Sequence, residues 1–198
     1  MLRLPFQTAL LLAPLAYALH HIEEHIIFHF RDWRLRYFPD NNQLSTETVL
    51  AILMAISLVY LLLHAIRQTR TSAAMAVLFL MSSQVHNAIY HIGGTLMFRD
   101  FSPGLITAIL LYVPINLIIV RAAIQDGWLK LHQVALLFLG GGLLFWGFEF
   151  LGPPPLLATT VATWVLILAS GQNRLAREQR LATGQEPDRE VTVTKPHV

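Results

Sequence analysis

The chain has 198 residues, of which 55% are hydrophobic and only 13% are charged, and its mean hydropathy is +0.53. Soluble domains carry about 25% charged residues, so this composition indicates an integral membrane protein. The net charge is only +2, and no basic face interleaved with aromatic residues suggests that the chain binds nucleic acid. Because the chain has no cysteine, disulfides, thiolate metal ligands and cysteine nucleophiles are all excluded.

Apolar stretches of nearly or fully membrane-spanning length, roughly 17–25 residues, recur along the chain. They predict about six transmembrane helices, over residues 4–29, 47–66, 72–98, 103–122, 131–151 and 155–171. We therefore expect an all-α polytopic membrane bundle that forms a single domain over residues 1–171. Residues 172–198 are polar and are expected to form a largely disordered C-terminal tail.

Several features modify individual elements. Pro14 removes a backbone hydrogen bond and is expected to kink the first helix. Residues 16–18 resemble a signal-peptidase site, but the apolar pattern resumes over residues 26–28, which favours an uncleaved first span. The glycines at 140–142 predict close helix packing in the fifth span. The longest connection, residues 31–46, is expected either to cover a site or to face lipid headgroups.

The distribution of basic residues predicts the orientation. Six spans place both termini on one side of the membrane, where we count ten Lys and Arg, against four on the other side. The positive-inside rule then places the N- and C-termini in the cytoplasm. Without the five basic residues of the tail the ratio is 5:4, so most of the contrast depends on the tail.

The most informative stretch is the run from His20 to His25, which holds five ionisable side chains in six residues after an apolar stretch. Ionisable groups within membrane spans are costly and generally serve a function. At a rise of 1.5 Å per residue, His20 to Glu24 lie roughly 24–30 Å along the first helix. Asn87 and His91 lie at a similar depth in the third helix, and so does Glu149 in the fifth. This coincidence predicts one polar pocket near the non-cytoplasmic leaflet.

Helical periodicity divides the cluster into two sets. At 100° per residue, His20, Glu23 and Glu24 share one face, which we expect to meet Asn87 and His91. His21 and His25 are turned about 100–140° away on an ideal helix. They are therefore expected to face a neighbouring helix or the headgroup region rather than the same small site.

Three interpretations of the cluster remain open. Imidazole and carboxylate groups suit zinc, iron or manganese, and His20, Glu23, Glu24 and His91 would supply three or four ligands from facing helices. Alternatively, two adjacent carboxylates in a pocket of low dielectric constant could divide acid and base roles without a metal. In the third interpretation the groups only pair with one another and with interfacial water.

Three motifs resemble those of the HXXEE family, small multi-pass membrane proteins of undetermined function. His20 to Glu24 match H-x-x-E-E, Asn87 to His91 match N-x-x-x-H, and residues 101–104 match Y-x-P-G with Phe101 in place of the tyrosine. The resemblance covers roughly residues 8–125. It implies that His20, Glu23, Glu24, Asn87 and His91 are functional residues and that the protein is an enzyme, but it implies no substrate.

Together these observations favour a metal-dependent membrane enzyme of the hydrolase type. His20, Glu23, Glu24 and His91 are the predicted metal ligands, Asn87 is a ligand or an orienting partner, and Glu23 or Glu24 is the general base. The expected substrate is a lipid or another apolar molecule that reaches the site from between the helices. The first alternative is a metal-free isomerase or cyclase of an isoprenoid or sterol-like substrate. The second is an ion or proton transporter or sensor.

Overall fold

The computed structural model describes residues 4–40 and 43–182, and within these ranges the chain is helical with no strand. The elements are, in order, α1 (Phe6–Leu10), α2 (Leu12–His21), η1 (Ile22–Ile27), α3 (Phe30–Tyr37), α4 (Thr46–Arg67), α5 (Arg70–Leu80), η2 (Met81–His86), α6 (Asn87–Phe98), α7 (Leu105–Thr107), η3 (Ala108–Tyr112), α8 (Val113–Gln125), α9 (Leu131–Leu151) and α10 (Pro153–Ala182). The three η segments are π-helical turns: η1 continues α2, and η2 and η3 each join the α-helices on either side. The predicted all-α class is confirmed.

Five helices in the described ranges are long and apolar enough to cross a membrane, rather than the six predicted. They cover Thr46–Arg67, Arg70–Phe98, Leu105–Gln125, Leu131–Leu151 and Pro153–Ser170. These match the second to sixth predicted spans. The last helix continues as far as Ala182, beyond the predicted boundary at 171, and residues 183–198 of the predicted tail lie outside the described residues.

The first predicted span is interrupted, which accounts for the difference in number. The helix is broken at Leu11, whose backbone N–H turns back to the carbonyl of Thr8 at 3.2 Å. Pro14 has no N–H to donate to the carbonyl of Leu10, so the regular hydrogen-bond ladder cannot continue through this turn. The proline therefore divides the segment into α1 and a second piece formed by α2 and η1.

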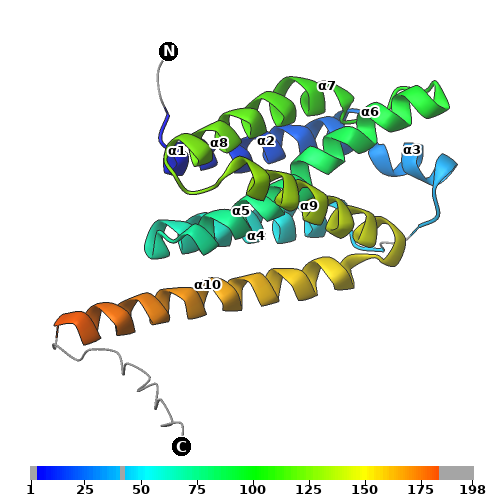
Figure 1. The fold of residues 1–198 in the computed structure, drawn as a ribbon. Coiled ribbons are helices and arrows are strands. Elements are labelled where there is room, and N and C mark those ends of the chain that lie inside the picture. The colour runs from blue at the N-terminus through cyan, green and yellow to red at the C-terminus, as the bar shows by residue number, and fades with distance from the viewer. Residues whose placement is uncertain (1–3, 41–42, 183–198) are drawn as a thin grey trace, which may run out of the picture.

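The helices run roughly along one common direction, as Figure 1 shows. The start of α1 and the end of α10 lie at the same end of the bundle. The opposite end carries α3, α6 and α7, together with the end of the first helical segment. A large apolar cluster, which includes Phe6, Leu10, Val77, Leu80 and Ile119, fills the part of the bundle that contains α1, α5 and α8.

The connection over residues 31–46, predicted as a loop, begins with a helix. Trp33 of α3 is only 1% exposed and packs with Tyr90 and Phe145. This segment is ordered as a helix because the burial of aromatic side chains supplies enough free energy to order a short amphipathic segment. Tyr37 donates a hydrogen bond to Asp100 at 2.9 Å, which raises the pKa of the tyrosine hydroxyl. Helix α3 is thereby fastened to the connection between α6 and α7 and covers that end of the bundle.

The predicted close packing of the glycine-rich helix α9 is confirmed. A Cβ atom added at Gly141 would lie 2.5 Å from the Cβ atom of Met81, so the two backbones approach too closely for any side chain. Gly142 similarly accommodates the ring of His86, whose Nδ1 lies 3.2 Å from the Met81 carbonyl. His86 therefore belongs to the contact between η2 and α9.

Candidate functional site

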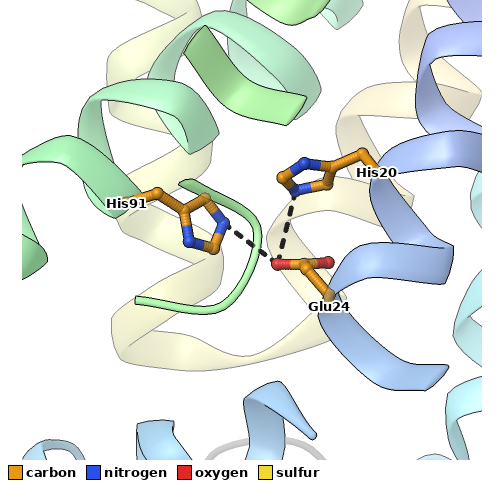
Figure 2. A group of neighbouring side chains, drawn as sticks. All are labelled: His20, Glu24 and His91. Carbon is orange, nitrogen blue, oxygen red and sulfur yellow. Dashed lines mark ion pairs between the residues drawn. The ribbon is translucent and has the colours of Figure 1, made fainter. Parts of the chain in front are cut away.

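The structure brings His20, Glu24 and His91 together at the end of the bundle covered by α3. The Nε2 atom of His91 lies 3.0 Å from Oε1 of Glu24, and the Nε2 atom of His20 lies 3.4 Å from the same oxygen. Figure 2 shows the two imidazoles converging on the carboxylate from different helices. All three residues are buried, and their ligand atoms lie within 4.8 Å of one another, so this group could hold a metal ion.

Hydroxyl groups orient both histidines from behind. The Nδ1 atom of His20 lies 2.7 Å from the hydroxyl of Thr107, and the Nδ1 atom of His91 lies 2.9 Å from the hydroxyl of Ser102. Thr107 also donates its hydroxyl proton to the carbonyl of Gly104, so it must accept a hydrogen bond from Nδ1 of His20. His20 then carries a proton on Nδ1, and its Nε2 faces the carboxylate at 3.4 Å.

The Nε2 atoms of both imidazoles face the same carboxylate oxygen. Within the described residues, Nε2 of His20 and Nε2 of His91 are buried, and each forms an ion-pair contact with Oε1 of Glu24. Ligands about 2.0–2.2 Å from a tetrahedral ion are about 3.3–3.5 Å apart, close to the 3.4 Å between His20 and Glu24 and longer than the 3.0 Å between His91 and Glu24. The chemistry of the three donors and the convergence of both Nε2 atoms on one carboxylate fit a divalent metal ion.

Glu23, the other predicted carboxylate ligand, has different partners. Its Oε1 accepts hydrogen bonds from the backbone N–H groups of Gly104 at 3.2 Å and Ile106 at 3.0 Å, and its Oε2 accepts one from Thr107 at 2.6 Å. These N–H groups belong to the first turn of the helix that begins at Leu105, where no intrahelical acceptor exists. Glu23 therefore anchors this helix and lies outside the group of three residues that could hold a metal ion.

Gly104 closes the connection between α6 and α7 over the three residues. Its φ angle of +97° suits glycine and strains other residues. A Cβ atom added there would lie 2.8 Å from His20, 2.9 Å from Glu24 and 2.9 Å from His91. The backbone at Gly104 thus fills the space beside all three ligands, and His91 is completely buried.

A cavity of about 160 Å³ opens on the other side of Glu24. His20, Glu24 and His25 form part of its polar wall, and Asn87 also lines it. Arg34 and Glu149, joined by an ion pair of 2.9 Å, line the cavity as well. Its apolar lining includes Val49, Leu53, Phe145, Phe148 and Leu156. The cavity therefore combines a polar group with walls that suit an apolar molecule.

Three further polar atoms of the cavity lining are buried without a hydrogen-bond partner in the part of the chain that the structure describes. These are the hydroxyls of Tyr90 and Tyr112 and Oδ1 of Asn87. The Tyr112 ring also lies against His20, with ring centroids 4.3 Å apart. Asn87, which the sequence proposed for the site, thus lies at the cavity and outside the group of three.

Sequence reasoning did not select Ser102, Thr107 or Tyr112. The first precedes the Pro-Gly of the third motif and the other two lie on an apolar helix, so only packing against distant segments reveals their contacts. Sequence reasoning also separated His25 from the site by helical phase. In the structure Glu24 lies between the two histidine sets, with its Oε2 3.5 Å from Nε2 of His25.

The π-helical turn over Ile22–Ile27 explains this difference in phase. The backbone N–H of Phe28 bonds to the carbonyl of Glu23, five residues earlier, at 3.1 Å. Such wider turns rotate less per residue than the ideal 100° and occur frequently at functional sites. Because all three segments around the site contain a π-helical turn, an ideal α-helical projection misplaces their side chains.

The bundle and its buried group of two histidines and a glutamate define a multi-pass helical membrane protein with a polar site at one end. The family model described as a protein of unknown function with an HXXEE motif matches residues 11–119, more than half of the chain. The chain belongs to this HXXEE family. Searches of characterised proteins and of solved structures found no match.

Proposed function

We propose that the protein is a membrane enzyme that uses a divalent metal ion, held by His20, Glu24 and His91, to hydrolyse a lipid or another apolar substrate. The observation that carries this proposal is the orientation of the two imidazoles. Each Nδ1 contacts a hydroxyl, and each Nε2 faces the same carboxylate oxygen of Glu24. A histidine that binds a metal ion through one ring nitrogen typically makes a hydrogen bond through the other.

The cavity supports an apolar substrate. Its walls come from several helices, and aromatic and aliphatic side chains make up much of its lining. A substrate with a hydrocarbon portion and one reactive polar group would bury the hydrocarbon against these walls. Its polar group would then lie beside His20 and Glu24, with the unpaired Asn87 and Tyr112 groups available for hydrogen bonds.

The chain's own residues then have distinct roles. A bound metal ion would polarise the substrate and activate a water molecule. Ser102 and Thr107 hold the two imidazoles, while Glu23 fixes the start of the helix that carries Thr107. Of the two carboxylates expected as general base, Glu24 lines the cavity, whereas Glu23 binds backbone N–H groups. We also propose that both termini lie in the cytoplasm and that the site lies near the non-cytoplasmic leaflet, as the distribution of basic residues predicts.

Elemental analysis of the protein purified in detergent tests the metal. We expect at least one equivalent of zinc, iron or manganese in the wild type and a loss of it in His20→Ala and His91→Ala. His132→Ala removes an exposed histidine at the start of α9 and should retain the metal. Metal well below one equivalent in the wild type, and unchanged by either site variant, would overturn the proposal.

The hydrolytic activity needs its own measurement. Liposomes made from total membrane lipid would be incubated with the wild type and with Glu24→Gln, and the lipids compared by mass spectrometry. We expect a lipid species to be consumed, with its hydrolysis products formed, only by the wild type. Equal product formation by both proteins would exclude Glu24 from the reaction.

A metal-free acid and base mechanism is the second candidate. It is favoured by the 3.0 Å separation of Glu24 and His91, which is short enough for a proton to be shared between them. The structure provides one carboxylate at this position instead of two, because Glu23 binds the backbone. Isomerisation of an apolar substrate by metal-depleted protein, lost in Glu24→Gln, would favour this candidate over hydrolysis.

A further inference from the structure

His21 and His25 form a second cluster on the opposite side of Glu24. Their ring centroids are 4.4 Å apart, and Nε2 of His25 lies 3.5 Å from Oε2 of Glu24. Ligand atoms of the three residues lie within 4.8 Å of one another, as in the first group. His21 is buried, and the side chain of His25 is 16% exposed.

The two clusters use different oxygens of the same carboxylate. Oε1 of Glu24 faces His20 and His91, whereas Oε2 faces His25. A carboxylate that offers one oxygen to each of two ions can bridge them, and paired metal sites place their ions about 3.5–4 Å apart. Helix-bundle proteins with two metal ions likewise combine glutamate and histidine ligands three residues apart, the spacing of His21 and Glu24.

We propose that the site binds a second divalent metal ion through His21, His25 and Glu24, with Glu24 bridging the two ions. This inference rests on the proposed function, because it takes the group of His20, Glu24 and His91 as the first ion's site. The π-helical turn from Ile22 to Ile27 makes the arrangement possible, since it brings Glu24 between two histidine sets that an ideal α-helix would separate.

The surroundings assign different roles to the two ions. The residues that would hold the first ion are enclosed by the backbone at Gly104 and include His91, which is completely buried. Of the residues that would hold the second, both His25 and Glu24 line the cavity. Three protein ligands with a position open to the cavity are typical of a catalytic ion. The cavity-facing ion would therefore contact the substrate and activate the water, in place of a separate carboxylate base.

Metal content and spin coupling test the second ion. The detergent-purified protein would be depleted of metal, loaded with Mn²⁺, desalted, and measured by elemental analysis and electron paramagnetic resonance. We expect two ions per chain with the spectrum of an exchange-coupled pair. His21→Ala and His25→Ala should each retain one ion with an uncoupled spectrum, and Glu24→Gln should lower the content below one ion. His132→Ala should retain the coupled pair.

The outcomes separate this inference from the proposed function. One ion per chain that is lost in His91→Ala but unchanged in His25→Ala would overturn the second site and support the first. Two ions without exchange coupling would overturn the bridging role of Glu24. No bound Mn²⁺ in the wild type would overturn both proposals. The spectrum of the wild type needs no variant, so misfolding of a variant cannot decide the result.

Discussion

Gly104→Ala adds one methyl group and should disrupt the site more than an alanine at the other glycines discussed below. The added Cβ atom would lie 2.8 Å from Cε1 of His20, 2.9 Å from Cγ of Glu24 and 2.9 Å from Cε1 of His91. Carbon atoms in contact are normally about 3.5–4.0 Å apart, so each of the three ligands must move by more than half an ångström or the backbone must withdraw.

Two contributions set the size of the effect. The φ angle of +97° costs a residue with a Cβ atom about 1–2 kcal/mol relative to glycine. Overpacking of a buried site adds about 1–3 kcal/mol. We therefore expect Gly104→Ala to lower the free energy of unfolding by about 2–5 kcal/mol. Metal affinity should fall as well, because all three ligands are displaced.

Two matched glycine variants separate these contributions. Gly127 has a φ angle of +74° and no atom within 4 Å of an added Cβ, so Gly127→Ala reports backbone strain alone. Gly93 lies in α6, where an added Cβ also meets no atom within 4 Å, and Gly93→Ala should stabilise by about 1 kcal/mol or have no effect. Thermal unfolding in detergent and a competition titration with a metal indicator would measure stability and metal affinity.

The comparison of Gly104→Ala with Gly127→Ala decides whether Gly104 packs against His20, Glu24 and His91. If both variants lose the same stability and both bind metal as the wild type does, the connection at Gly104 does not pack on the three ligands. The geometry of the candidate site described above would then be wrong. A loss of metal binding in Gly127→Ala, which lies between α8 and α9, would also refute the reasoning because that position does not contact the site.

Three other substitutions test individual contacts. Glu23→Gln should lower the free energy of unfolding by about 1.5–3 kcal/mol, because a charged acceptor of backbone N–H groups is lost, while elemental analysis should show the metal retained. Thr107→Val removes the hydroxyl that holds His20 and should weaken metal binding about 10–100-fold in a competition titration. Glu149→Gln neutralises the partner of the largely buried Arg34 and should cost about 3 kcal/mol in thermal unfolding.

Each of these has a control within the same chain. Glu24→Gln should show the reverse of Glu23→Gln, with metal lost, and equal loss of metal in both would make Glu23 a ligand. Thr107→Ser keeps the hydroxyl and should bind metal as the wild type does. Arg31→Gln breaks an exposed ion pair with Asp40 and should cost less than about 1 kcal/mol. If Arg31→Gln lowered the free energy of unfolding as much as Glu149→Gln, burial would not be what makes the ion pair of Arg34 and Glu149 important.

The sequence predicted the helices and their polar positions because both depend on local properties. A run of apolar residues forms a helix in a membrane whatever its neighbours, since every backbone group must be hydrogen-bonded within the segment. The constant rise per residue then placed His20, Glu24 and His91 at one depth, and the structure brings these three residues together. The interruption at Leu11 was anticipated only as a kink at Pro14.

Only the tertiary structure distinguished Glu23 from Glu24. The two are adjacent in the sequence. Glu23 nevertheless accepts a hydrogen bond from Thr107, 84 positions further along at the start of another helix, whereas Glu24 contacts two histidines. The contact of His20 with Thr107 likewise spans 87 positions. Such partners depend on how separate helices pack and on where a π-helical turn changes their phase, and neither follows from the periodicity of one segment. The sequence by itself thus determined that His20, Glu24 and His91 lie at one depth, whereas packing decided which other residues and which atoms meet there.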